Sequence, residues 1–302
     1  MAPATRRGHP DALPPLRAKW RSSQNSQRGA RPRLLLASRF LVSRLPVERF
    51  LEFPLLVLGV SLFVLWLSAQ AGVLLRLRFW ELAKDVREDY SIIIAAALTL
   101  LGLLIGFTFS MATSRYDLRK HCEAEEANAI GTEYLRAGIL SPADAAKVRA
   151  LLKDYIDQRI RFYSAYHGRD GEEISHTLAR TAELQNEMWS AVAIAAGSRS
   201  DAPMALVLSG MNDVLDTQGY AQAAFWNRIP AEAWVLMGLI AIVCNILLGY
   251  GAHGHRSFLL VVLPLTLAIA FALLADIESP ERGAIRIHPR NLEGVAKSIH
   301  QQ

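Results

Sequence analysis

One apolar stretch, residues 91–114, carries the side chains whose types and spacing could act on an ion. Small and hydroxyl-bearing residues recur along it at helical spacing, at Thr99, Gly102, Gly106, Ser110 and Thr113. At about 100° per residue they form a stripe roughly 80° wide on one helix face. Such a stripe suits a pore wall, because hydroxyl groups replace part of an ion's hydration shell while bulky Ile105 and Phe109 form a hydrophobic constriction. It also suits close helix packing, since Gly102 and Gly106 form a GxxxG step.

Charged and polar side chains begin immediately after that stretch. Arg115 and Arg119 lie one helical turn apart, with Asp117 between them, and the polar residues Glu126 and Asn128 follow. Rings of like charge at the mouth of a pore would concentrate ions there. Anchoring at the membrane interface and ordinary ion pairs along a helix account for the same residues, and the mixed charge composition favours this second interpretation.

Acidic residues also follow the last apolar stretch. Asp276 and Glu278 stand where a helix should end, and a negative charge there opposes the helix dipole. The two carboxylates are therefore expected to have partners, either Arg282 or the long polar segment that precedes the third apolar stretch. The plainer interpretation is a turn that ends the helix at Pro280 and Gly283.

Candidates for catalysis and for metal binding are poor. The eight histidines are scattered, and His253 and His255 have no carboxylate or cysteine near them in the sequence. Cys122 and Cys244 lack the spacing of a redox pair or a catalytic nucleophile. Phosphate-binding and hydrolase motifs are absent as well. The sequence therefore predicts no catalytic residue, no metal site, no cofactor and no enzymatic activity.

The stripe lies in one of four stretches that contain no Asp, Glu, Lys or Arg. The four stretches are residues 53–75, 91–114, 233–255 and 257–275. Each matches the roughly 20 apolar residues that a helix needs to cross a bilayer core. A hydrophobic fraction of 52% and a mean hydropathy of +0.19 agree with this. The sequence predicts an all-α integral membrane protein with four transmembrane helices, two within residues 51–113 and two within residues 231–275. The lack of Asp, Glu, Lys and Arg inside the stretches argues against an ion-coupled transporter.

The hydrophilic residues 114–230 have helical spacing throughout. The second transmembrane helix is expected to continue to about Gly138. New helices are expected after the capping box Ser141–Asp144 and after Asp201. The segment therefore predicts a helical domain inserted between the second and third transmembrane helices.

Lysine and arginine are distributed unevenly along the chain. Residues 1–50 hold 11 of them, residues 114–230 hold 13 and the tail, residues 276–302, holds 4. Residues 76–90 hold 4, and the connection between the third and fourth helices holds only Arg256. Because positive residues mark the cytoplasmic side, both termini and residues 114–230 are expected to be cytoplasmic, and the chain to reside in the inner (plasma) membrane.

The net charge of +5 and the pI of about 9.4 would suit a nucleic-acid-binding protein. The excess of positive charge lies entirely in residues 1–50, however, since these carry a net charge of +9 and the remaining chain carries −4. This basic leader is rich in Pro, Ser and Arg and is expected to be mostly disordered, so no nucleic-acid partner is predicted. Its expected role is to set the topology, although residues 33–50 could instead lie on anionic lipid as an amphipathic helix.

Four short motifs accompany the apolar stretches: Gly-Phe-Thr-Phe-Ser (106–110), Ser-Arg-Tyr-Asp-x-Arg (114–119), Glu-Ala-Asn-Ala-Ile-Gly-Thr (126–132) and Asp-x-Glu-x-Pro-x-x-Gly (276–283). Together they resemble the bestrophin-like family of mainly bacterial membrane proteins, over about residues 53–285. The motif at 126–132 is the most specific of them. The motif positions singled out are Arg115, Asp117, Arg119, Glu126, Asn128, Asp276 and Glu278.

Bestrophins, which are remote relatives of this family, are pentameric ion channels, mostly selective for anions such as chloride, with cytoplasmic termini and a second span that lines a hydrophobic neck. The resemblance therefore implies a homo-oligomer, by analogy a pentamer, that passes an inorganic ion across the lipid bilayer. The implied pore residues are Thr99, Gly102, Ile105, Gly106, Phe109, Ser110 and Thr113. The chain has no clear counterpart of the calcium-binding acidic cluster of animal members. The alternative is a non-conducting scaffold or sensor whose cytoplasmic domain binds a partner, and it predicts a monomer or dimer with the stripe buried inside the chain.

Overall fold

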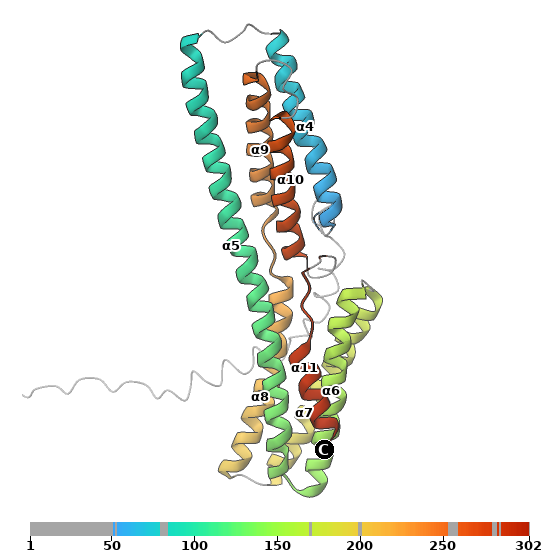
Figure 1. Ribbon diagram of the computed structural model, residues 1–302. Coiled ribbons are helices and arrows are strands. Elements are labelled where there is room, and N and C mark those ends of the chain that lie inside the picture. The colour runs from blue at the N-terminus through green and yellow to red at the C-terminus, as the bar shows by residue number, and fades with distance from the viewer. Residues whose placement is uncertain are drawn as a thin grey trace, which may run out of the picture. The chain divides into compact units, whose positions relative to one another are not determined.

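The computed structural model describes residues 51, 53–78, 84–168, 171–198, 201–252, 259–279, 283 and 285–301. The predictions for the basic leader, for Arg282 and for His253 and His255 lie outside these residues. Within the described part of the chain, all the regular elements are helices (Figure 1). The prediction of an all-α protein is therefore confirmed.

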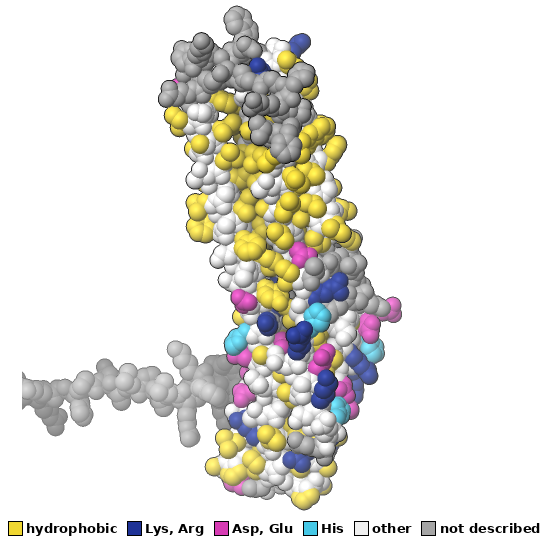
Figure 2. All heavy atoms as spheres, viewed as in Figure 1, with side chains coloured by type: hydrophobic (Ala, Val, Ile, Leu, Met, Phe, Trp, Pro, Cys, Tyr) yellow, Lys and Arg dark blue, Asp and Glu magenta, His cyan; other side chains and the backbone are white. Residues whose placement is uncertain are grey.

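Four helices of the described chain are long and apolar enough to cross a membrane, as the sequence predicted. They are α4 (Pro54–Arg78), the first part of α5 (Lys84–Arg136), α9 (Ala231–Gly251) and α10 (Leu259–Glu278). Hydrophobic side chains gather over the part of the molecule that these helices form, and charged side chains gather elsewhere (Figure 2). α10 runs through Pro264 without ending, and a kink at this position stays a prediction.

α5 does not end with its apolar stretch. It continues to Arg136 and then tightens into the 3-10 turn η1 (Ala137–Ile139), close to where the sequence predicted its end. The other helices of the inserted domain are α6 (Pro142–Gly168), α7 (Gly171–Ser198) and α8 (Ala202–Trp226), of which α6 and α8 begin where the sequence predicted. α6 begins after Ser141, whose hydroxyl oxygen accepts a hydrogen bond from the backbone N–H of Asp144 at 3.3 Å, and α8 begins after Asp201, whose side chain caps its first turn.

The tail contains an element that the sequence analysis did not anticipate, the helix α11 (Arg290–His300). Its Leu292, Ala296 and Ile299 are buried in the same core as the apolar faces of α5, α6, α7 and α8. A helix that follows the last two transmembrane helices in the chain therefore completes the inserted domain. The signal was present, because apolar residues three and four positions apart mark an amphipathic helix.

α4 and α9 approach each other closely at two glycines. A Cβ atom added to Gly72 would overlap the backbone carbonyl oxygen of Ile246, and one added to Gly249 would overlap that of Ala69. In a membrane, such small residues let two helix backbones pack in van der Waals contact. The GxxxG step of α5 does not pack in this way, since a Cβ atom added to either of its glycines meets nothing within 4 Å.

We expect Gly72→Val and Gly249→Val each to lower the free energy of unfolding by about 2–3 kcal/mol, the upper range of overpacking. A branched side chain cannot fit between the two backbones. Thermal unfolding of the detergent-solubilised protein measures the change. Gly59→Val in α4 is the matched control, since a Cβ atom there meets nothing within 4 Å. Equal stability of all three variants would contradict the close packing of α4 on α9.

Candidate pore helix and its buried charges

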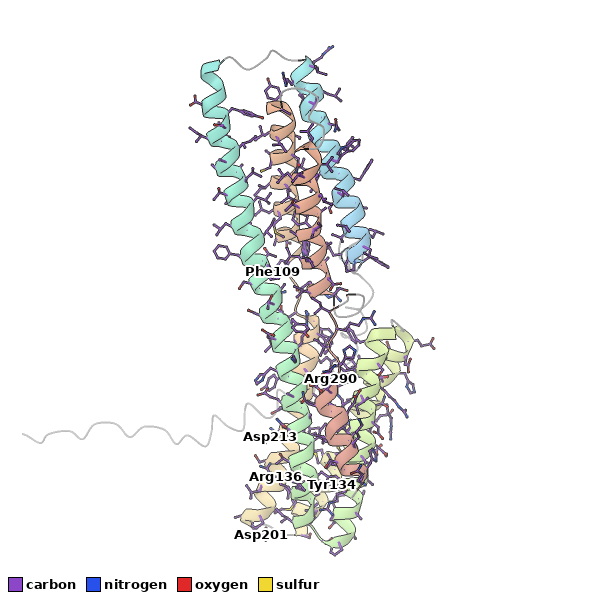
Figure 3. All side chains as sticks on the ribbon, viewed as in Figure 1. Phe109, Tyr134, Arg136, Asp201, Asp213 and Arg290 are labelled. Atoms are coloured by element: carbon purple, nitrogen blue, oxygen red, sulfur yellow. The ribbon has the colours of Figure 1, made fainter. Side chains whose placement is uncertain are left out.

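The predicted pore stripe lies on a face of α5 that no other described helix covers. Its small and hydroxyl-bearing residues are all exposed in the subunit: Thr99, Gly102, Gly106, Ser110 and Thr113. Phe109, labelled in Figure 3, is 44% exposed, and Ile105 is partly buried. Packing inside the described chain therefore does not account for the stripe.

The opposite face of α5 attaches the helix to the rest of the membrane part. Leu101, Thr108 and Ala112 are buried there, and the hydroxyl of Thr108 lies 3.4 Å from the sulfur of Met237 in α9. At about 100° per residue, the centre of the stripe lies roughly 140° from this buried face. α5 therefore packs on α9 and α10 with one face and leaves the stripe for water, lipid or another subunit.

The threonine hydroxyls of the stripe are engaged within their own helix. Thr99 donates to the carbonyl oxygen of Ala95 at 2.8 Å, and Thr113 donates to that of Phe109 at 3.0 Å. Each hydroxyl oxygen keeps its lone pairs, and a hydroxyl must turn away from the backbone before it can donate to an anion. The stripe thus offers weak, replaceable contacts to an ion rather than a tight binding site.

Charged side chains join α5 to the ends of α8, α9 and α10 where the apolar stretch of α5 ends. The guanidinium of Arg119 is buried, and its Nε and Nη2 atoms donate to two carbonyl oxygens at the end of α8, each at 3.0 Å. Glu278 at the end of α10 accepts a hydrogen bond from the backbone N–H of Ile229 at 2.7 Å and another from Arg115 Nη1 at 3.4 Å. Its Oε1 atom lies 3.9 Å from Arg119 Nη2.

These contacts supply the partners that acidic residues at a helix C-terminus need. Glu278 finds them in α5 and in the connection between α8 and α9, while Asp276 accepts a hydrogen bond from the backbone N–H of Ile285 at 3.1 Å. Arg119 Nη1 and Glu278 Oε2 are buried without a hydrogen-bond partner among the described residues. Arg115 and Arg119 therefore share the carboxylate of Glu278.

Glu126, from the most specific motif, forms a second ion pair inside the helical domain. Its carboxylate accepts hydrogen bonds from Arg159 Nε and, at 3.3 Å, from Arg159 Nη2, and both side chains are 0% exposed. The guanidinium also lies over the ring of Phe162, 4.5 Å from its centroid. Burial opposes the charge of Arg159, but the adjacent carboxylate outweighs this and raises the pKa of the guanidinium. Burial and the charge of Glu126 likewise raise the pKa of Tyr155 and of Tyr163, which pack nearby.

Glu123 holds α11 against α5. Its buried carboxylate accepts hydrogen bonds from the backbone N–H groups of Asn291 and Leu292, both at 3.0 Å, and from the side chain of Asn291 at 2.6 Å. These backbone groups belong to the first turn of α11, where a helix leaves its N–H groups unpaired and its dipole favours negative charge. α5 therefore supplies the N-terminal cap of the last helix.

Arg159 was not singled out in the sequence, and the burial of Glu123 and Glu133 on α5 was not anticipated. The signal that could have found those on α5 is helix phase. Arg119, Glu123, Glu126 and Glu133 follow one another at steps of four, three and seven residues, which places them on one face. This face continues the one that is buried in the membrane part of α5, so charges on it require partners.

For Arg119 and Glu126, the structure favours the interpretation as ion pairs over that as a charged ring at a pore mouth. Both are buried in contacts inside the chain, where they cannot face a vestibule. Arg115 is partly buried against Glu278, and only Asp117 and Asn128 are exposed. Among the described residues, no group of three His, Cys, Asp or Glu side chains is placed to hold a metal ion. Arg119, Glu126, Arg159 and Glu278 thus form ion pairs, and Glu123 caps a helix.

The chain matches the sequence profile of the Bestrophin-like domain over residues 61–292, which is more than half of its length. It is similar to the crystal structure of a variant of a bacterial bestrophin homolog from Klebsiella pneumoniae, with a TM-score of 0.58 and 14% identity over 81% of this chain and 98% of that chain. A second variant from Klebsiella pneumoniae gives a TM-score of 0.58 and 13% identity, over 82% and 97% of the two chains. A search of curated protein sequences found no match. The profile match, together with the shared fold, shows that this chain belongs to the bestrophin-like family of membrane proteins.

Proposed function

We propose that this chain is one subunit of a homo-oligomeric ion channel in the inner (plasma) membrane, with α5 at the axis of the pore. The observation that carries the proposal is the stripe of small and hydroxyl-bearing residues, which is exposed in the subunit and lies opposite the buried face of α5. The proposed lining residues are Thr99, Gly102, Ile105, Gly106, Phe109, Ser110 and Thr113. Both termini and residues 114–230 are proposed to be cytoplasmic, with the transmembrane helices in residues 51–113 and 231–275.

The other exposed surfaces support a special role for this face. α4 exposes large apolar side chains such as Leu55, Phe63 and Leu67, which suit a helix that faces lipid. The stripe of α5 has little apolar area to offer lipid, but leaves room for water along an axis. Leu103 and Phe107, which lie beside the stripe, are exposed and suit contact with a neighbouring subunit.

The helical domain also favours an oligomer. It exposes large apolar side chains that water contacts in the single subunit: Leu135, Ile194, Leu206, Tyr220 and Trp226. Such surfaces usually mark contacts between proteins. A second copy of the chain on each side would cover them, and a pentamer is proposed by analogy with bestrophins.

Anion passage is proposed from the charges at the end of the stripe. Arg115 and Arg119 lie at this end of the stripe, and both approach the carboxylate of Glu278. A positive potential beside a pore raises the local concentration of anions. Phe109, which flanks the stripe, would form the hydrophobic constriction, backed by Ile105, which is partly buried against the core of the membrane part.

Purified protein in planar lipid bilayers is expected to show discrete conductance steps. Ile105→Ala and Phe109→Ala should increase the unit conductance, because each removes bulk from the proposed constriction. Phe63→Ala is the matched control, since Phe63 is also an exposed aromatic residue but lies on α4. In a salt gradient, the reversal potential should follow the equilibrium potential of the anion. A verified pentamer that remains silent, or an equal response to all three substitutions, would overturn the proposal.

The competing function is a non-conducting scaffold or sensor that binds a cytosolic partner. It predicts a monomer or dimer in which the stripe is buried inside the chain, and the exposure of the stripe disfavours it. A mass measurement of the detergent-solubilised oligomer separates the two functions, because a monomer has no axial pore. No enzymatic activity is proposed for the chain.

A further inference from the structure

One buried carboxylate takes part in none of the contacts described so far. Glu133 lies near the end of α5, roughly 28 Å along the helix beyond Ser114, where the apolar stretch ends. It is 0% exposed, and neither of its oxygens has a hydrogen-bond partner among the described residues. Glu123 and Glu126 on the same face each accept at least two hydrogen bonds. An ionised carboxylate in the position of Glu133 would be costly to bury.

Glu133 lies where α5 packs against α8, opposite a residue that has no side chain. A Cβ atom added to Gly210 would overlap Glu133 Oε2 and the guanidinium of Arg136. α8 thus leaves room for the carboxyl group but donates no hydrogen bond to it. Arg136, one turn further along α5, extends to Asp213 of α8, with 4.0 Å between Nη1 and Oδ2 (Figure 3). This guanidinium is the nearest charge that could compensate an ionised Glu133.

We propose that Glu133 is a protonation-controlled latch between α5 and α8, closed while its carboxyl group is neutral and loosened when that group ionises. The neutral group can stay buried against Gly210. The ionised group needs a hydrogen bond from water or from Arg136. Either partner requires α5 and α8 to shift, because the space at Gly210 is filled and Arg136 extends to Asp213. Since α5 is one continuous helix, such a shift acts on the element that carries the stripe, although the latch does not depend on conduction.

Neighbouring charges determine the pH at which the latch responds. Burial raises the pKa of Glu133 to about 8, while Arg136 on the same helix lowers it and Asp213 on α8 raises it. From α6, Arg149 donates to the carbonyl oxygen of the next residue of α5 and Lys153 lies over that residue's ring, so neither pairs with the carboxylate.

The other titratable groups on the packed helices are engaged elsewhere. Asp216 of α8 accepts a hydrogen bond from Asn212 at 2.8 Å. On α11, His300 lies 3.1 Å from Asp157 of α6, and Lys297 is exposed. Of the titratable groups at this contact, Glu133 is the one that is buried with no hydrogen-bond partner among the described residues.

The sign of the effect follows from proton linkage. The pKa of Glu133 is raised from the ordinary 4.5 to about 8 in the folded protein. Between pH 4.5 and about pH 8, the carboxyl group is therefore protonated in the folded state but ionised in the unfolded state. Folding stability should therefore fall as the pH rises through this window and become constant above it. The same change should increase the opening of the α5–α8 contact.

The test uses the full chain in lipid nanodiscs as wild type, Glu133→Gln and Glu125→Gln, the last being an exposed glutamate on α5. Infrared difference spectra of the wild type should contain the carbonyl band of a protonated carboxyl group at neutral pH, and the band should disappear above about pH 8. It should be missing only in Glu133→Gln. Hydrogen exchange at the α5–α8 contact, corrected for its intrinsic pH dependence, should increase severalfold over the same range in the wild type and in Glu125→Gln, but not in Glu133→Gln.

Two further variants should move the pH midpoint of the carboxyl band in opposite directions, and they remain informative if Glu133→Gln does not fold. Asp213→Asn should lower the midpoint of the carboxyl band, because Asp213 raises the pKa of Glu133, whereas Arg136→Gln should raise the midpoint. A role in packing alone would produce no such opposed shifts. The proposal is overturned if the wild type lacks the band at neutral pH, if Glu133→Gln keeps the wild-type pH dependence, or if the two charge variants move the midpoint in the same direction.

Discussion

Replacing Arg159 with methionine is expected to unfold the helical domain under conditions in which the wild type is stable. The substitution leaves Glu126 ionised without its charged partner in an interior where both side chains are 0% exposed. Removing one partner of a buried ion pair costs about 3–5 kcal/mol, which is large beside the roughly 5–15 kcal/mol that stabilise a whole domain. The contact of the guanidinium with the ring of Phe162 is lost as well. Thermal or denaturant unfolding in detergent measures the effect.

A double-variant comparison separates the ion pair from packing. Glu126→Gln alone should be similarly destabilising, since it leaves the guanidinium of Arg159 buried without a counter-charge. Glu126→Gln combined with Arg159→Met should cost less than the sum of the two, because no unpaired charge remains. Arg180→Ala is the control, since it removes only exposed contacts with Glu183 and Glu187 on α7, and should leave stability unchanged. Additive losses would refute the importance of the pair.

Arg119→Met is expected to loosen the junction between the membrane helices and the helical domain, at a cost of about 3 kcal/mol. The variant loses two hydrogen bonds to carbonyl oxygens at the end of α8 and the contact with Glu278 at the end of α10. Hydrogen bonds of charged groups contribute about 1.5–3 kcal/mol each, and buried acceptors left unpaired add to the loss. Hydrogen exchange should increase most at residues 224–230, whose backbone Arg119 and Glu278 hold in place.

Conservative and neighbouring substitutions distinguish geometry from charge at this junction. Arg119→Lys should recover only part of the stability, because an ammonium group cannot reproduce the fixed fork of the guanidinium. Arg115→Gln should have a smaller effect, since the Arg115 side chain is 15% exposed and contacts Glu278 at 3.4 Å without bonding to α8. A loss from Arg115→Gln as large as that from Arg119→Met would contradict the role assigned to Arg119.

The membrane part of the fold could be predicted because few alternatives exist for an uncharged stretch of bilayer length. Residues 91–114 and their three counterparts became helices of the expected length. The starts of α6 and α8 were also predictable, since Ser141 and Asp201 act on backbone groups only three residues away. α11 was not predicted, although Leu292, Ala296 and Ile299 follow helical spacing, and its partners in the core lie on segments far away in the chain.

The candidate site was predictable only in part. Helical spacing established that Thr99, Gly106 and Ser110 share a face, but left open whether that face is packed or exposed. Spacing likewise identified Arg119 and Glu126 without showing that both are buried. Whether charged residues on one helix face line the mouth of a pore or form ion pairs inside the chain depends on which segments cover that face.

By itself, the sequence determined the four membrane helices, the helical character of the inserted domain and the faces on which its small, charged and apolar residues lie. These features follow from composition and from a period of 3.6 residues, both of which are local. Only the tertiary structure decided that Glu126 pairs with Arg159, that Glu123 caps a helix 168 residues later, and that the carboxylate of Glu133 has no hydrogen-bond partner among the described residues. Each of these outcomes depends on segments far apart in the chain meeting across a buried surface, which local spacing cannot specify.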